Sequence, residues 1–128
     1  MASEPILIVD DNQLNLKLTR ILLEKQGYSV YIAGDGVEAL SLLEKVKPRL
    51  VLMDLQLPGM DGLEVTRRIK SSPGMSGIIV VALTAYAMKG DEEKARDAGC
   101  DGYITKPIDT RALPGQIRRY LDAGASSK

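Results

Sequence analysis

Residues 50–62 read LVLMDLQLPGMDG, and the beginning of this stretch decides the fold. Its apolar run, Leu50 to Met53, is rich in the residues of buried strands, and the acid Asp54 follows at once. Short apolar runs of the same kind occur at Ile6 to Val9, Val30 to Ala33, Ile78 to Leu83 and Tyr103 to Ile104. The sequence therefore predicts five short strands, the third of which carries Asp54 at its carboxyl end.

Helical patterns separate these runs. Two sets of residues each share one helical face and are expected to face the core: Leu14, Leu18, Ile21 and Leu22, and then Leu113, Ile117, Tyr120 and Leu121. Pro114 is awkward inside a helix, so the last helix is expected to begin irregularly or near that residue. Strict alternation of strand and helix predicts an α/β fold, with a parallel sheet covered by helices on both faces.

The capping signals agree with this division. Asp35 with Glu38, and Asp61 with Glu64, have the spacing of a capping box and mark two helix starts. Three residues mark helix ends: Gly27, Pro48 and Gly99.

The composition is that of a single globular domain. The chain has 128 residues, of which 45% are hydrophobic and 27% are charged. Lys plus Arg and Asp plus Glu number 17 each, so no general attraction to nucleic acid or to an anionic membrane is expected. Cys100 is the only cysteine, and the amino terminus lacks the features of a signal peptide. We expect a cytoplasmic protein with one domain at residues 1–122 and a polar tail at residues 123–128.

Chemically suited side chains follow four of the five predicted strands. Asp10 and Asp11 follow the first strand and Asp54 follows the third. Thr84 follows the fourth strand, and Lys106 follows the fifth. In open α/β sheets, ligands bind at the carboxyl ends of the strands, beside the point where the strand order reverses. With the order 2-1-3-4-5, that point lies between the first and third strands, which carry the three acids.

Three carboxylates in one crevice require a positive charge. Two like charges about 4 Å apart repel by on the order of 4 kcal/mol at an effective dielectric constant near 20. Mg²⁺ suits a small set of carboxylates, whereas the absence of histidine argues against a zinc site. Lys106 offers a fixed positive charge and Thr84 a hydroxyl donor, and both suit the oxygens of a phosphoryl group.

Each of these residues also has an ordinary structural interpretation. Asp11 and Asn12 could form the N-cap of a helix, and Asp54 could be a turn residue. Thr84 could be a half-buried hydroxyl at a strand end, and Lys106 a solvated surface charge. Any one of these interpretations is reasonable by itself, but four strand ends with the right chemical types together favour a functional site.

Four runs resemble the CheY-like receiver domains of response regulators in their order and spacing: IVDDN, VLMDLQLPGMDG, ALTAYA and YITKPI. The resemblance covers nearly the whole chain up to Leu121. Two segments, NQLNLKL and TAYAMKGDEEKARDAGCDGYITKPI, look especially like those of stand-alone DivK-type regulators and of receivers fused to hybrid kinases. The resemblance implies a doubly wound, flavodoxin-like (βα)5 fold, a three-layer sandwich with the parallel strand order 2-1-3-4-5.

The resemblance also implies a role for the residues at the predicted site. Asp54 would be the phosphoacceptor, while Asp10 and Asp11 would hold Mg²⁺. The backbone carbonyl of Gln56 would complete the metal shell together with Asp54. Lys106 would contact the phosphoryl group.

Further implied roles concern switching. Thr84 would be the switch hydroxyl and Tyr103 the switch aromatic residue, and the peptide bond between Lys106 and Pro107 would be cis. The fourth and fifth helices would form the output surface.

The implied function is a phosphorelay step without a DNA-binding output domain in this chain. A histidine kinase or a histidine phosphotransfer protein would donate the phosphoryl group, and a downstream protein would receive the signal. The domain would be a signalling phosphoacceptor, not an enzyme, although it would assist its own Mg²⁺-dependent phosphotransfer and dephosphorylation. It would bind neither nucleic acid nor membrane, and would be a monomer or a weak phosphorylation-dependent dimer.

Three other interpretations remain open at this point. A phosphohydrolase with an aspartyl nucleophile typically needs a second Asp two residues after the first, where this sequence has Gln56. A flavin- or nucleotide-binding module needs a phosphate cradle, but the first loop has the charged residues Asp10 and Asp11. A degenerate receiver that only binds partners is disfavoured by the complete set of acids, hydroxyl and lysine.

Overall fold

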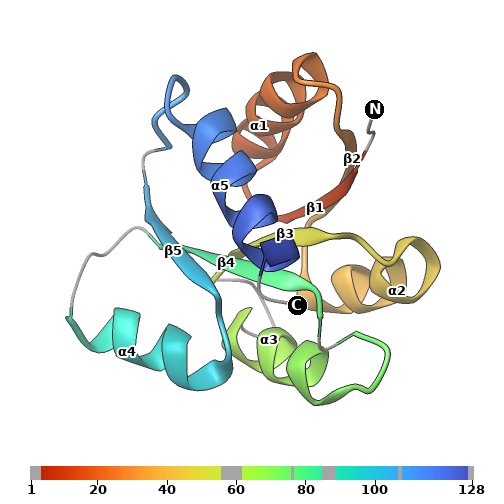
Figure 1. Cartoon of the computed structure of the whole chain (residues 1–128), viewed down its shortest axis with the longest axis vertical. Coiled ribbons are helices and arrows are strands. Elements are labelled where there is room, and N and C mark those ends of the chain that lie inside the picture. The colour runs from red at the N-terminus through yellow and green to blue at the C-terminus, as the bar shows by residue number, and fades with distance from the viewer. Residues whose placement is uncertain (1–3, 56–61, 76, 85–88, 107, 127–128) are drawn as a thin grey trace.

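In the computed structural model, five strands and five helices alternate along the chain (Figure 1). The structure describes residues 4–55, 62–75, 77–84, 89–106 and 108–126. The strands are β1 (Pro5–Val9), β2 (Ser29–Ala33), β3 (Leu50–Asp54), β4 (Ile79–Thr84) and β5 (Gly102–Thr105). The helices are α1 (Gln13–Lys25), α2 (Gly36–Val46), α3 (Gly62–Ser71), α4 (Lys89–Ala98) and α5 (Leu113–Ser126).

The strands form one parallel sheet in the order β2-β1-β3-β4-β5, which confirms the predicted fold. The predicted strand bounds are correct to within a residue or so at each end. Asp54 and Thr84 are the last residues of β3 and β4, so they end the strands and do not follow them.

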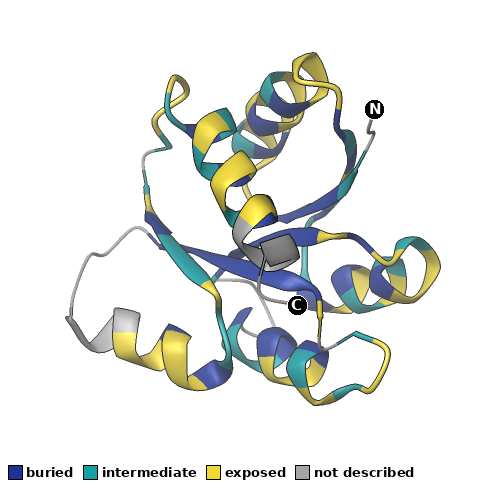
Figure 2. Cartoon of the chain, in the orientation of Figure 1, coloured by how far each residue is buried: buried dark blue, intermediate teal, exposed yellow. Residues whose placement is uncertain are grey.

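The helices cover both faces of the sheet, with α1 and α5 on one face and α2, α3 and α4 on the other (Figure 1). Alternate residues of β1 enter two separate apolar clusters: Ile6 and Ile8 join the cluster that includes α1 and α5, while Leu7 and Val9 join the cluster under α2 and α3. Every residue of β3 and β4 is buried, and the helices expose their outer faces (Figure 2). The central strands are therefore held by apolar contacts on both sides.

The predicted core stripe of α5 is confirmed, since Leu113, Ile117 and Leu121 are fully buried and Tyr120 packs against the same cluster. The helix begins at Leu113, and Pro114 lies in its first turn, where the missing N–H costs no helical hydrogen bond. The helix continues to Ser126, past the domain end predicted at residue 122. The division of the chain at that residue stays a prediction.

The predicted core stripe of α1 is wrong. Leu14, Leu18 and Ile21 are 74%, 44% and 46% exposed, whereas Leu16 and Leu23 are buried in the core. The helix has apolar residues on two faces, and periodicity alone cannot tell which face meets the sheet. The buried residues of α1 are Leu16, Thr19 and Leu23, which are three and four positions apart, as a core face requires. Leu22 is only partly buried against the same cluster.

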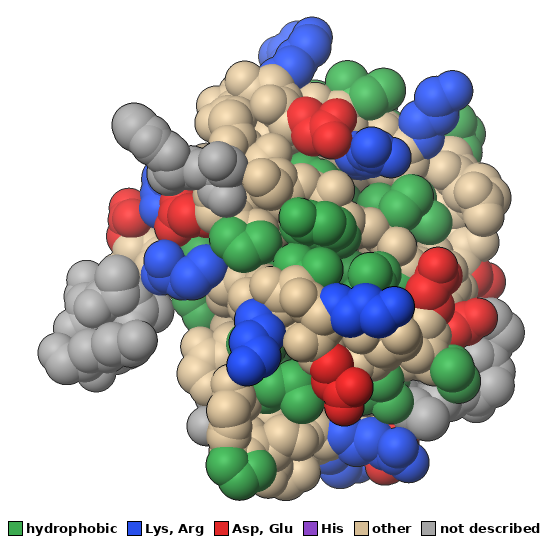
Figure 3. All heavy atoms as spheres, turned by 90° about the vertical axis from the view of Figure 1, so that its right-hand side faces the viewer, with side chains coloured by type: hydrophobic (Ala, Val, Ile, Leu, Met, Phe, Trp, Pro, Cys, Tyr) green, Lys and Arg blue, Asp and Glu red, His purple; other side chains and the backbone are tan. Residues whose placement is uncertain are grey.

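Apolar residues outside α1 are exposed as well. Exposed Tyr31 lies on the edge strand β2, and exposed Val37 lies on α2. Figure 3 shows the side of the molecule that carries the β2 edge, where hydrophobic side chains gather near the centre and charged side chains of both signs lie around them. Among the described residues, no helix has the length and apolar character needed to span a membrane.

The helix caps agree with the sequence where they can be compared. The side chain of Asp35 accepts a hydrogen bond from the backbone N–H of Glu38, which confirms the predicted N-cap and helix start. The carboxylate of Glu38 accepts its hydrogen bond from the N–H of Gly34, one residue before the position that a capping box uses. Gly27 and Gly99 follow α1 and α4 with φ values of 95° and 107°, which ends both helices as predicted. Asp61 lies outside the described residues.

The correction on α1 leads to a prediction about stability. Leu23→Ala removes a fully buried side chain, and we expect it to lower the free energy of unfolding by about 2–5 kcal/mol. Leu18→Ala changes an exposed residue of the same helix and should cost less than about 1 kcal/mol. Urea unfolding of both variants measures the difference. Equal losses would show that the two faces of α1 are assigned wrongly.

Candidate functional site

The acids predicted to form a site meet at the carboxyl edge of the sheet. Asp10 directly follows β1, and Asp54 ends β3. The two strands are neighbours, and Val9 lies opposite Met53, so the next residues of both chains lie side by side. This position is also the point where the strand order reverses, which is where open α/β sheets bind ligands.

Three carboxylates form one cluster at this point. Asp10, Asp11 and Asp54 each place a carboxylate oxygen within 4.8 Å of the others. Asp10 and Asp54 are 1% and 3% exposed, whereas Asp11 is exposed at the mouth of the site. The cluster therefore has two acids in a nearly dry setting and one that faces water.

Lys106 lies among the buried acids. Its Nζ lies 2.9 Å from Oδ2 of Asp54 and 3.1 Å from Oδ2 of Asp10. Its backbone N–H donates to the carbonyl of Thr84 at 2.7 Å, which fixes the segment after β5 against the end of β4. One ammonium group thus contacts acids from two other strands.

The surroundings of Lys106 act on its pKa in opposite directions. Burial lowers the pKa, because the charged form loses water. The hydrogen bonds to Asp54 and Asp10 and the charges of these two acids raise it, and together they prevail, so the pKa lies above its ordinary value. Lys106 is consequently a permanent cation at neutral pH.

The loop after β1 serves both structure and the site. Asn12 is the N-cap of α1, and its side chain accepts a hydrogen bond from the N–H of Asn15 at 3.1 Å. Oδ1 of Asp10 accepts a hydrogen bond from the N–H of Asn12 at 2.9 Å. The N-cap interpretation is therefore correct for Asn12, while Asp10 and Asp11 direct carboxylate oxygens to the cluster.

Gly62 supports the site and was not singled out by the sequence analysis. A Cβ atom at this position would clash with the backbone carbonyl oxygen of Asp54 and crowd Leu55. Gly62 also donates its backbone N–H to the carbonyl of Leu55 at 3.4 Å. The first turn of α3 can therefore lie directly against the backbone of the phosphoacceptor candidate only because residue 62 has no side chain. The sequence does place a glycine at the predicted start of this helix, and that glycine could have indicated a close approach of two backbones.

Two further predicted site residues lie on the neighbouring strands β4 and β5. Thr84 ends β4 beside β3 and is 2% exposed. Tyr103 lies on β5, opposite Ala82 of β4. Gln56 and Pro107 lie outside the described residues, so the metal-binding carbonyl and the cis peptide bond stay predictions.

The donor set has the chemistry of a site for a hard divalent cation. Three carboxylates and one ammonium group leave a net charge of two negative units in the site. The cluster offers only oxygen ligands, which Mg²⁺ and Ca²⁺ prefer, and neither histidine nor cysteine contributes to it. The carboxylates can bind a cation, and the ammonium group of Lys106 can at the same time pair with an anion.

Comparison with known proteins agrees with this geometry. Residues 6–118 match the model of the response regulator receiver domain family. The chain is 47% identical over 116 residues to the polar-differentiation response regulator DivK of Brucella anthropi, a match that covers 91% of this chain and 94% of that protein. It is 46% identical over 119 residues to DivK of Brucella ovis, with 93% and 97% covered.

Solved structures show the same likeness. A CheY-like response regulator receiver domain protein from Methanospirillum hungatei JF-1 superposes with a TM-score of 0.91 at 33% identity, covering 99% of this chain and 100% of that one. The receiver domain of a sensor histidine kinase from Pseudomonas aeruginosa PAO1, solved with a magnesium ion coordinated in its active site cleft, gives a TM-score of 0.86 at 33% identity, with 94% and 99% covered.

The chain belongs to the response regulator receiver domain family. It is thus a signalling domain of two-component systems, and the phosphohydrolase and the flavin- or nucleotide-binding interpretations are set aside.

The contacts of Lys106 generate a prediction about stability and pH. Lys106→Met keeps the aliphatic stem but removes the charge shared by Asp10 and Asp54. With a chelator present, we expect the free energy of unfolding at pH 7 to fall by about 1–3 kcal/mol. Because the pKa of Lys106 is raised in the folded state, this difference is fully present below the unfolded pKa of about 10.4. It should shrink as the pH rises through the higher folded pKa.

Urea unfolding at neutral and alkaline pH measures this difference. Lys17→Met is a matched control, since Lys17 is exposed on α1. Equal stability of wild type and Lys106→Met at pH 7 would contradict the assignment of Lys106 as the counter-charge.

Proposed function

We propose that Asp54 accepts a phosphoryl group from the phosphohistidine of a histidine kinase or a histidine phosphotransfer protein, in a Mg²⁺-dependent phosphorelay. The observation that carries the proposal is the contact of one lysine with two buried acids, beside a third acid, in a receiver domain. This arrangement supports a nucleophilic carboxylate with positive charge held ready for an incoming phosphoryl group.

Mg²⁺ fits the donor set described above. Asp10, Asp11 and Asp54 would hold it, with the carbonyl of Gln56 as a further ligand. The bound ion would neutralise the phosphoryl oxygens and bring them close to the carboxylate. The three acids need such a charge, because Lys106 compensates only one of them.

In the proposed reaction, a carboxylate oxygen of Asp54 attacks the phosphorus atom of the donor. An O–P bond forms, the P–N bond to the imidazole breaks, and its electron pair stays on the imidazole nitrogen. The product is an acyl phosphate on Asp54, which water later hydrolyses back to carboxylate and inorganic phosphate. Lys106 pairs with a phosphoryl oxygen during transfer, and its raised pKa keeps it charged throughout. The domain assists this chemistry mainly by holding the groups in position.

Switching follows from the added charge. A phosphoryl group brings about 1.5 to 2 negative charges to the strand ends. Thr84 ends the neighbouring strand β4, and we propose that its hydroxyl donates to a phosphoryl oxygen. Tyr103 on β5 then repacks inward and alters the surface built from α4 and α5, which a downstream protein reads.

The exposed stripe of α1 supports a protein as the phosphoryl donor. α1 begins two residues after Asp11, and Leu14 and Leu18 are exposed on it. A groove of about 500 Å³ beside them is lined by Gln13, Leu14, Leu16, Lys17, Arg20 and Ile32. A partner that brings its phosphohistidine to Asp54 would cover this apolar surface, which is rimmed by basic residues.

The proposed setting is cytoplasmic, and the proposed partners are proteins. The formal net charge of zero gives no general attraction to nucleic acid or to an anionic membrane. We propose a monomer or a weak dimer that depends on phosphorylation. The protein is a signalling phosphoacceptor in this account, and its only chemistry is its own phosphorylation and dephosphorylation.

The direct test of this function is the covalent product. Incubation with acetyl phosphate or phosphoramidate and Mg²⁺ should add one phosphoryl group to the wild type. Asp54→Asn keeps the shape of the side chain but loses the anionic nucleophile, so it should add none. Intact-mass measurement counts the groups, and circular dichroism confirms that the variant is folded.

The chemistry of the product separates the possible acceptors. An acyl phosphate is cleaved by hydroxylamine, whereas a phosphothreonine is stable to it. Treatment should therefore return the wild type to its original mass if Asp54 is the acceptor. An equal gain of mass in folded Asp54→Asn, or a gain that resists hydroxylamine, would move the acceptor to another residue and contradict the proposal.

A further inference from the structure

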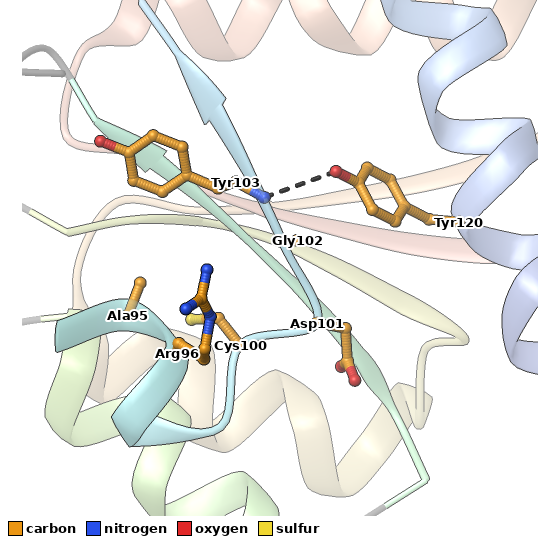
Figure 4. A pocket seen from close by; sticks show the side chains of 7 residues that line it. All are labelled: Ala95, Arg96, Cys100, Asp101, Gly102, Tyr103 and Tyr120. Atoms are coloured by element: carbon orange, nitrogen blue, oxygen red, sulfur yellow. Dashed lines mark hydrogen bonds between the residues drawn. The ribbon is translucent and has the colours of Figure 1, made fainter. Parts of the chain in front are cut away.

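Tyr120 makes a specific contact with the strand that carries Tyr103. The backbone N–H of Tyr103 donates to Oη of Tyr120 at 3.5 Å (Figure 4). In the described part of the chain, β5 is an edge strand that pairs with β4 and has no strand on its outer side. A side chain of α5 thus supplies the acceptor that a further strand would otherwise provide.

Gly102 makes this contact possible. A Cβ atom at residue 102 would clash with ring atoms and with Oη of Tyr120. The ring of Tyr120 therefore lies directly against the backbone of β5, one residue before Tyr103. Ile117 and Leu121, which flank Tyr120 on α5, are fully buried and fix the helix on the sheet. The contact joins a rigidly packed helix to the backbone of the proposed switch residue.

The two tyrosines border the same cavity. It has a volume of about 300 Å³, and in Figure 4 the side chains of Tyr103 and Tyr120 lie on opposite sides of the β5 ribbon. The cavity is lined by Ala95, Arg96, Cys100, Asp101, Gly102, Tyr103 and Tyr120. It leaves open space beside β5, between residues of α4 and Tyr120 of α5.

We propose that Tyr120 is a positioning residue that couples the backbone of β5 at Tyr103 to α5. This inference rests on the proposed function and names the connection through which the state of Asp54 reaches the fifth helix. A shift of the β5 backbone that accompanies the repacking of Tyr103 would turn its N–H, and the hydroxyl of Tyr120, which accepts from that group, would follow. α5 therefore responds to phosphorylation through the hydroxyl of Tyr120, while the phosphorylation chemistry itself does not depend on this residue.

The test compares amide chemical shifts of ¹⁵N-labelled protein before and after phosphorylation with phosphoramidate and Mg²⁺. Tyr120→Phe keeps the ring against Gly102 and removes only the acceptor. We expect it to fold, to gain one phosphoryl group as the wild type does, and to keep the response at Tyr103. The chemical-shift change of the α5 amides on phosphorylation should fall to roughly half or less of the wild-type change, because the hydrogen bond between Tyr103 and Tyr120 is lost.

Two further variants sharpen the test. Tyr31→Phe is a matched control on the opposite edge strand, β2, and should respond in α5 as the wild type does. Gly102→Ala displaces the Tyr120 ring from β5 while the tyrosine itself is unchanged. It should therefore reduce the α5 response in the same way as Tyr120→Phe does.

The outcomes separate this inference from the function on which it rests. A full wild-type response of α5 in phosphorylated Tyr120→Phe would overturn the role of Tyr120 and leave the phosphoacceptor function intact. An equal loss of the α5 response in Tyr31→Phe would also overturn it, because the loss would then not be specific to the β5 contact. If the wild type gains no phosphoryl group by mass, the proposed function fails, and this inference fails with it.

Discussion

The contact of Lys106 with Asp10 and Asp54 is the constraint on which the site depends. Two carboxylates that are almost completely buried, and a third nearby, would repel each other strongly without a cation. The lysine reaches them from the segment after β5, across the end of β4, so four strand ends have to be held in register. One ammonium group relieves only part of the repulsion, and the remaining negative charge suits a divalent cation.

The sheet can hold these charges because its central strands are buried on both faces. β3 and β4 have no exposed residue, and their apolar side chains enter both core clusters. Burial of this kind provides the stability that offsets the local cost of an acidic crevice. Gly62 lets α3 approach the backbone of Asp54 closely, so the strand end is enclosed by packed elements while its carboxylate still reaches the cluster.

Much of this arrangement could be predicted from the sequence. Buried parallel strands are apolar throughout, so they are easy to recognise in the sequence. Their carboxyl ends lie at the same edge of the sheet, and this predicted that Asp10, Asp54 and Lys106 lie close together. The core face of α1 was mispredicted, because a helix with leucines on two sides does not reveal which one packs. The contact of Tyr120 with Gly102 could not be predicted, since it joins separate elements and depends on the exact docking of α5.

Phosphorylation of Asp54 is expected to require Mg²⁺ bound by the acidic cluster. The most direct measurement is the gain of phosphoryl groups from phosphoramidate, followed by intact mass, while Mg²⁺ is titrated from a chelated start. No phosphoryl group should be gained in the presence of the chelator. As Mg²⁺ is added, phosphorylation should rise with a midpoint that agrees with Mg²⁺ binding measured by calorimetry. In Asp11→Ala, the midpoints of phosphorylation and of binding should both move to higher Mg²⁺ concentrations. Phosphorylation at an unchanged rate in the presence of the chelator would contradict this requirement.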